Sequence, residues 1–249
     1  MKKPGRNTEG LRGDMHLHTT VSDGRASPEE TVLTAVEKEL DFIAVTDHDT
    51  FRGSLLAQKA ARSMGAEIVV LTGAEIRTTH GDILVYCSGE PPSRVPRDPL
   101  ELRDYMQSEG CLVVPAHPFD KRRKGIGELV YEGGWDAIEV FNAYSDPWSN
   151  RRAAEAARQL GLPGLANSDA HVPEAIGAAY NLVQAEPDAG AEEILEAIRR
   201  GRVVPVPGRP DAGAYLRTLS WSIERRLRRR RGGPSRLDYL EEEGIPYEG

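Results

Sequence analysis

Residues 15–48 of this 249-residue chain read MHLHTTVSDGRASPEETVLTAVEKELDFIAVTDH. The short apolar run Met15–His18 is followed at residues 27–30 by SPEE, which is typical of a helix N-cap, a proline in the first turn and acidic residues after it. We expect that helix to reach about Leu40, and a second apolar run, Phe42–Thr46, comes next. The stretch therefore predicts one strand–helix–strand unit.

The same alternation continues along the chain. Further apolar runs lie at Glu67–Leu71, Ile83–Cys87, Cys111–Ala116, Ala137–Phe141, Gly164–Ala166 and Asn181–Val183. Helical patterns fill most of the gaps: one begins at Asp98-Pro99, and two others, Arg151–Leu160 and Ala191–Arg200, end at glycines. Alternating strands and helices predict an α/β domain with a largely parallel sheet, either open or closed into a barrel. The length suits one large domain.

Composition indicates what kind of core the protein has and in which compartment it lies. With 39% hydrophobic residues the chain can bury a core, but no window approaches the ~18 consecutive apolar residues of a membrane span. The polar residues 1–13 lack the apolar segment of a secretory signal, so we expect a cytoplasmic protein with no membrane contact. Cys87 and Cys111 each lie in an apolar run, which predicts two reduced core thiols rather than a disulfide.

Charge is distributed unevenly. The formal net charge of −7 argues against a protein that coats nucleic acid, although it allows a local basic patch. Residues 221–231 are strongly basic, and residues 241–243 are three glutamates. We expect a solvated or frayed terminal helix here, with a contact to nucleic acid or to another phosphate-rich partner as the alternative.

Histidines and carboxylates follow the apolar runs. Four runs end in such residues: His16 and His18, Asp47 and His48, His117, and Asp169 with His171. A His-x-His pair on a strand places both rings on one face, because side chains alternate with period two. In α/β folds, sites gather where the strands end. The alternative is that these histidines bind no metal and are simply packed in the core or exposed on the surface, but such residues would not end nearly every run.

This ligand set predicts a cluster of two or three divalent cations. Mixed imidazole and carboxylate ligation suits Zn²⁺, Mn²⁺ or Fe²⁺, and the cluster contains no cysteine. Neighbouring cations repel each other unless a carboxylate lies between them. Glu75, just past the run that ends at Leu71, is the best candidate for this bridge.

The motifs resemble those of the PHP family, named for polymerase and histidinol phosphatase, over about Gly13 to Glu186. The resemblance rests on Asp14–Thr19, Ser22–Gly24, Thr46–Thr50, Gly73–Glu75, Ala116–Pro118, Ile138–Asn142 and Ser168–His171. It implies a distorted, TIM-like (β/α)7 barrel with the metal site at its C-terminal mouth. The corresponding division of the chain is a polar leader (1–13), a PHP phosphoesterase domain (14–217) and a tail (218–249).

The resemblance also implies how the ligands are shared. The first ion would be held by His16, His18, Glu75 and Asp169. Glu75 would bridge to a second ion that also binds His117, and the third ion would bind Asp23, His48 and His171.

The remaining ligand of the second ion departs from the family pattern. Relatives place a histidine directly before the strand that follows the bridging glutamate, whereas this chain has Asp82 there and His80 two positions earlier. We favour His80 for its ligand type and keep Asp82 as the alternative. The long insertion that some nucleotide-hydrolysing relatives carry after this strand is missing, which predicts a more open cup.

Three divalent cations would bring six positive charges, whereas Asp23, Glu75 and Asp169 return three negative ones. The surplus of positive charge favours a phosphate ester as the substrate. A water bridging two cations would be acidified and attack phosphorus in line. We expect Glu75, His117 and Asp169 to carry catalysis at this centre. Residues expected to support it are Asp14, Asp47, Asp49 and Asn142 behind the ligands, and Arg52 and Arg122 on the phosphate.

The function that follows is hydrolysis of small, nucleotide-type phosphomonoesters. The alternatives are a 5′-to-3′ exonuclease on short RNA or DNA, an amidohydrolase-like enzyme, and a non-catalytic metal-binding PHP module. Only 6% of residues are aromatic, which disfavours a base-stacking surface for nucleic acid. The excess of metal ligands disfavours the amidohydrolase, and the nearly complete ligand set disfavours the inert module.

Overall fold

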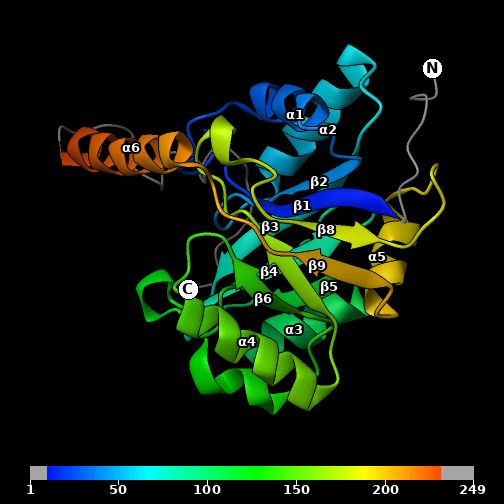
Figure 1. Cartoon of the computed structure of the whole chain (residues 1–249). Helices are drawn as coiled ribbons and strands as arrows, with labels where there is room; N and C mark the ends of the chain where they lie inside the picture. The colour runs from blue at the N-terminus through cyan, green and yellow to red at the C-terminus, as the bar shows by residue number, and fades with distance from the viewer. Residues whose placement is uncertain (1–9, 231–249) are drawn as a thin grey trace.

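The computed structural model describes residues 10–230 and shows a mixed α/β fold around a curled sheet (Figure 1). Seven strands pair in the order β5-β4-β3-β2-β1-β8-β9, and β6 pairs with β7 beside them. Their bounds are β1 (Leu11–Leu17), β2 (Phe42–Val45), β3 (Val69–Arg77), β4 (Asp82–Cys87), β5 (Leu112–Pro115), β6 (Ile138–Asn142), β7 (Gly164–Asn167), β8 (Tyr180–Val183) and β9 (Val203–Val206).

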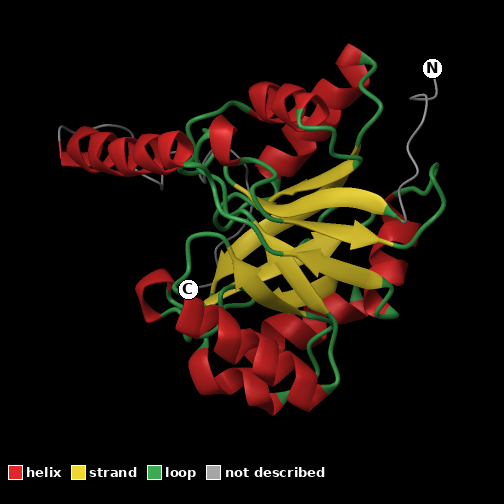
Figure 2. Cartoon of the chain, in the orientation of Figure 1, coloured by secondary structure: helices red, strands yellow, loops and turns green. Residues whose placement is uncertain are grey.

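Helices cover the outside of the curled sheet, and α6 extends away from the body (Figures 1 and 2). The α-helices are α1 (Pro28–Glu37), α2 (Arg52–Met64), α3 (Pro99–Ser108), α4 (Pro147–Leu160), α5 (Ala191–Arg199) and α6 (Ala212–Arg230). Short 3-10 helices are η1 (Lys121–Arg123), η2 (Gly127–Glu132) and η3 (Pro173–Ala175). No helix in the described part is long and apolar enough to cross a membrane.

The predicted helix starts are confirmed where capping residues mark them. Ser27 forms a capping box with Glu30 at the start of α1, and the Asp98 side chain accepts from the first turn of α3. Helix α4 begins four residues earlier than the predicted Arg151, because Asp146 caps it and Pro147 occupies the first turn. It ends as predicted at Gly161, which has a left-handed backbone with φ 67°.

The prediction of a largely parallel sheet is wrong. Only β1–β2 and β2–β3 pair in parallel within the seven-stranded sheet, whereas β3–β4, β4–β5, β1–β8 and β8–β9 are antiparallel. A turn at residues 78–81 joins β3 directly to β4, so no helix can cross between them. A regular (β/α)7 barrel is therefore not confirmed, although the α/β class is.

The prediction of two reduced cysteines is also wrong, because Cys87 and Cys111 form a disulfide. The antiparallel register of β4 and β5 pairs Tyr86 with Leu112, so the next pair outward brings these two residues opposite each other. Their Cα atoms are 4.3 Å apart, and both are buried. A parallel sheet, as expected from the sequence, would not have made them neighbours.

The predicted leader and tail are in part continuous with the folded body. Leu11–Gly13 of the leader are the first residues of β1, and α6 runs across the predicted boundary at residue 218. The division into 1–13, 14–217 and 218–249 thus remains a proposal. Residues 1–9 and the acidic stretch 241–243 lie outside the described residues.

Candidate metal centre

Side chains from β1, β3 and the loop after β7 converge on one point. His16 Nε2 lies 3.4 Å from Glu75 Oε2 and 3.6 Å from Asp169 Oδ1. His18 Nε2 lies 3.3 and 3.4 Å from the same two oxygens. Ligand bonds of about 2.1 Å in a tetrahedron give edges of about 3.4 Å. These four separations therefore match edges of such a tetrahedron, and His16, His18 and Glu75 form a group that could hold an ion.

A second group shares Glu75. His117, just after β5, places Nε2 3.0 Å from Glu75 Oε1, and Asp82 at the start of β4 offers an oxygen to the same group. Asp82 is 5% exposed, whereas His80 is exposed and has Nδ1 2.9 Å from Thr79 Oγ1. The turn that makes the β3–β4 hairpin carries His80 outward. This placement favours Asp82 as the ligand, whereas the sequence had led us to prefer His80.

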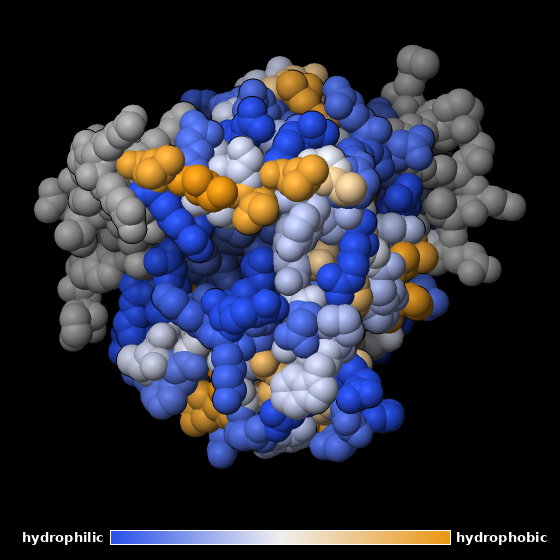
Figure 3. All heavy atoms as spheres, turned by 60° about the vertical axis from the view of Figure 1, so that its left-hand side comes forward, coloured by the Kyte–Doolittle hydropathy of each residue, from blue (hydrophilic) through white to orange (hydrophobic). Residues whose placement is uncertain are grey.

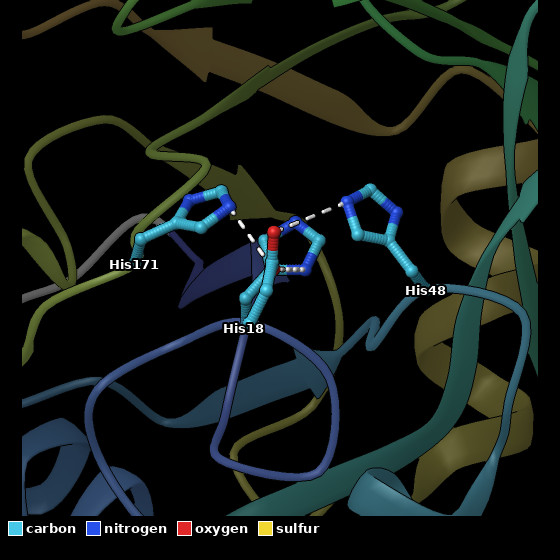
Figure 4. A group of neighbouring side chains, drawn as sticks. His18, His48 and His171 are labelled. Carbon is cyan, nitrogen blue, oxygen red and sulfur yellow. Dashed lines mark ion pairs between the residues drawn. The ribbon is translucent and has the colours of Figure 1, made fainter. Parts of the chain in front are cut away.

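A third group surrounds Asp23. Its Oδ1 lies 3.3 Å from His171 Nε2 and 3.6 Å from His18 Nδ1, and its Oδ2 lies 3.8 Å from His48 Nε2. The three rings face a common space from separate elements (Figure 4). Gly24 makes this loop possible, since a Cβ there would lie 2.0 Å from the carbonyl oxygen of His18.

The donor atoms fit divalent cations. His16 Nε2, His18 Nε2 and Asp82 Oδ1 are buried and have no hydrogen-bond partner among the described residues. Leaving a buried polar atom unpaired costs free energy, so these atoms are suited to an ion. The residues could hold Mn²⁺, Zn²⁺ or Fe²⁺, which accept mixed nitrogen and oxygen ligands.

Electrostatics reinforce this arrangement. Burial alone would raise the pKa of Glu75, but His48 and His16 bring it well below its ordinary value. Burial lowers the pKa of His18 to about 3, together with the neighbouring His171, whose ring stacks on it at 4.2 Å. Burial also raises the pKa of Asp82 to about 6, together with the charge of Glu75. An ionised Glu75 and a neutral His18 are the forms that bind metal.

Two candidate ligands have unusual backbone conformations. His117 and Asp169 have φ values of 32° and 51°, and each lies in the turn that follows a strand. Non-glycine residues in the left-handed region carry strain, which a structure retains mostly where function requires a side-chain direction.

Glu139 on β6 is the functional residue that sequence reasoning missed. It accepts a hydrogen bond from His16 Nδ1 at 2.9 Å and one from the His117 backbone N–H at 2.7 Å. This contact fixes the His16 ring so that Nε2 faces the centre. A register shift after Glu139 lets Asn142 donate to it across 3.2 Å, although strict alternation would put the two on opposite faces. The only signal in the sequence was its place in the Ile138–Asn142 motif.

The residues expected behind the ligands are placed as follows. Asp14 accepts from the backbone N–H groups of Ser168 and Gly177, while Asp47 accepts from Thr19 and Ser22. Both aspartates thereby fix the loops that carry the ligands. Asp49 accepts from Arg97 and from the backbone of Arg77 on β3. Asn142 donates to Asp169 Oδ2 at 3.1 Å and thus touches a candidate ligand directly.

The basic candidates divide differently from expectation. Arg122 is 72% exposed and pairs with Asp120 and Asp146 outside the centre. Its neighbour Arg123, in contrast, reaches inward and bonds Asp169 Oδ2 through Nη1. Arg52 begins α2 and is half-buried. One residue of the Lys121–Lys124 run therefore faces the centre, but it is not the residue that we predicted.

Comparison with known proteins assigns the chain to a family. Residues 147–203 match the family model described as PHP-associated. The chain belongs to the PHP family. It is 30% identical to the uncharacterised protein MJ1587 of Methanocaldococcus jannaschii over 54% of this chain and 83% of that protein.

Other relatives match over shorter stretches. A 5′-3′ exoribonuclease of Haemophilus influenzae is 43% identical over 26% of this chain, and a 3′,5′-nucleoside bisphosphate phosphatase of Chromobacterium violaceum is 34% identical over 30%. The chain spans only 23% and 26% of these two proteins. A two-domain protein from Bacteroides vulgatus with a predicted PHP-like metal-dependent phosphoesterase shares the fold, with a TM-score of 0.66 and 22% identity over 80% of this chain and 65% of that one.

Proposed function

We propose that this PHP protein is a metal-dependent phosphomonoesterase acting on small, nucleotide-type substrates. The observation that carries the proposal is the convergence of four overlapping groups of possible ligands, which are linked through His16, His18, Glu75 and His117. His16, His18, Glu75 and Asp169 would hold one cation. A second would lie between Glu75, Asp82 and His117, and a third between Asp23, His48 and His171.

The proposed chemistry needs cations for two tasks. Two or three Mn²⁺, Zn²⁺ or Fe²⁺ ions would acidify a water and neutralise charge on the phosphoryl oxygens. The chain's own residues orient the site: Glu139 fixes His16, and Asn142 holds Asp169 in place. Glu75 faces histidines from three separate elements, which suits it to bridge two ions.

The charges of the site support a phosphate substrate. Five buried carboxylates surround it, namely Asp23, Glu75, Asp82, Glu139 and Asp169. Asp14 and Asp47 lie behind them. Three divalent ions together with Arg123 and Arg225 would bring eight positive charges, one more than these seven carboxylates carry. An anionic substrate would balance the surplus. The Chromobacterium relative named as a bisphosphate phosphatase supports the same substrate class.

A 5′-to-3′ exonuclease is the second candidate, supported by the Haemophilus relative named as an exoribonuclease. To separate the two, purified protein loaded with Mn²⁺ is given nucleoside monophosphates, bisphosphorylated nucleosides, histidinol phosphate and a 5′-phosphorylated oligoribonucleotide. We expect inorganic phosphate from a small ester, and none after chelation or with His117→Ala. Mononucleotides released from the oligomer, without free phosphate, would replace the phosphatase by the nuclease. Metal binding without any product would favour the non-catalytic module.

Arg122 and Arg123 form a matched pair for testing the phosphate contact. Arg123→Met should raise KM about tenfold, because a hydrogen bond to a charged group contributes roughly 1.5–3 kcal/mol. Arg122→Met removes the same charge from the exposed side of η1 and should change KM less than about twofold. KM is measured by steady-state kinetics on the ester that the enzyme hydrolyses. Equal KM values for both variants would show that Arg123 does not contact the phosphate.

A further inference from the structure

The C-terminal helix α6 is fixed to the body by one face. Ala214 is fully buried, Thr218 Oγ1 lies 2.6 Å from the hydroxyl of Tyr144, and Trp221 Nε1 donates to the backbone oxygen of Asp23 at 2.9 Å. These three residues and Arg225 recur every three or four positions, the spacing of one helical face. The expected solvated terminal helix is confirmed for residues 221–227, none of which is buried, but one face of the helix contacts the body.

The opposite face of α6 is apolar and exposed. Its residues Leu216, Leu219, Ile223 and Leu227 are 63%, 52%, 52% and 49% exposed. A row of hydrophobic side chains crosses the surface above a hollow lined by hydrophilic residues (Figure 3). The helix thus has a definite rotation about its axis, and this rotation turns Arg225 toward the body.

Arg225 ends at the metal centre. Its Nη1 bonds Asp23 Oδ2 and also donates to the Asp23 backbone oxygen at 3.1 Å. Asp23 is 8% exposed, and its Oδ1 points to His18 and His171. The guanidinium thus bonds Oδ2, which also lies 3.8 Å from His48 Nε2, and leaves Oδ1 to His18 and His171.

Arg225 retains donors for a further acceptor. Both contacts use Nη1, and no hydrogen bond of Nε or Nη2 is found among the described side chains and backbone groups. The side chain is 26% exposed, so part of it is accessible to solvent. A guanidinium fork matches the spacing of two phosphate oxygens.

Arg123 repeats this arrangement on the other side of the centre. It bonds the Oδ2 of Asp169, whose Oδ1 faces His16 and His18. Two guanidinium groups beside two or three cations would repel them. Such a set becomes favourable when an anion lies between the groups.

From these contacts we infer that Arg225 binds a phosphate group of the substrate beside the Asp23 group, which makes α6 part of the substrate site. The inference rests on the proposed phosphoesterase function and adds a specificity-determining residue to it. Arg225 holds Asp23 through Nη1 and receives phosphate oxygens through Nε and Nη2. No basic residue of the sequence motifs supplies this contact.

The test compares Arg225→Met with Arg226→Met, which removes the same charge from the neighbouring, exposed position. Binding of inorganic phosphate to the Mn²⁺-loaded full chain is measured by calorimetry, and bound metal is counted by elemental analysis. Arg225→Met should weaken phosphate binding about 10- to 100-fold with unchanged metal content, whereas Arg226→Met should change it less than about twofold. Arg225→Lys, which keeps the charge but not the fork, should fall between them.

Other outcomes overturn the inference. Equal phosphate affinity in Arg225→Met and wild type would show that Arg225 does not bind the anion. Loss of metal in the variant would show that it acts on the cations through Asp23, and tighter phosphate binding would show that it blocks the site. If wild type binds phosphate and Arg225→Met does not, yet no ester is hydrolysed, the proposed function fails, and only the binding of a phosphate anion by Arg225 is retained.

Discussion

Glu75→Gln is expected to lower kcat/KM by roughly 10²- to 10⁴-fold, because the stabilisation that metal ions provide in such reactions amounts to several kcal/mol. The substitution keeps the shape of the side chain but replaces one carboxylate oxygen by an NH2 group, which cannot bind a cation. Glu75 is 1% exposed and faces His16, His18, His48 and His117, so no other carboxylate can take over its position.

Metal content should decrease together with activity. Elemental analysis of Glu75→Gln is expected to show at least one ion fewer per chain than wild type. Glu109→Gln, on the exposed end of α3, removes an equal charge and should leave both quantities unchanged. A Glu75→Gln variant with full metal content and activity would exclude the bridging role of this carboxylate.

Removal of metal is expected to cause the second large effect, a drop in thermal stability that depends on pH. An ion present at 100 times its Kd stabilises the folded state by about 2.7 kcal/mol, and a chain of this size shifts its Tm by roughly 2–4 °C per kcal/mol. Each ion lost to a chelator should therefore lower Tm by roughly 5–10 °C. Differential scanning calorimetry with and without chelator measures the difference.

The sign of the pH dependence follows from the histidines. Burial lowers the pKa of both His16 and His117, but in the metal-free protein neighbouring carboxylates outweigh it. Asp169 contributes most to the raised pKa of His16, and Glu75 contributes most to that of His117. Raised pKa values stabilise the metal-free fold most below about pH 6.5, and this contribution is lost as pH rises through the folded values. Ions also displace these protons. The Tm difference should thus grow from pH 6 to pH 8, and a difference that shrinks would contradict the assignment.

Local sequence signals predicted much of this protein. Ser27 with Glu30 and Asp98 with Pro99 define helix starts through contacts within one turn, and Gly161 ends α4 because it tolerates a left-handed backbone. The PHP motifs also marked the histidines that the structure brings together. These features depend on residues close in sequence, so they can be predicted from a short stretch of the chain.

The direction of the strands could not be predicted from the sequence, and it bears on two of the predictions, the state of the cysteines and the choice between His80 and Asp82. The antiparallel β3–β4–β5 pairing brings Cys87 to Cys111 and turns His80 outward while Asp82 enters the centre. Apolar runs look alike in either direction, because side chains alternate in both. Whether two strands pair in parallel or antiparallel depends on the packing of the whole sheet.

What the sequence determined, then, is which residue types end the strands; what tertiary structure decided is which of them meet. Asn142 reaches Glu139 because of a register shift in β6, and Arg123 rather than Arg122 turns inward because η1 sets its direction. Arg225 reaches Asp23, 202 positions away, only because α6 docks through Trp221 and Thr218. Contacts over such separations depend on packing that no local pattern encodes.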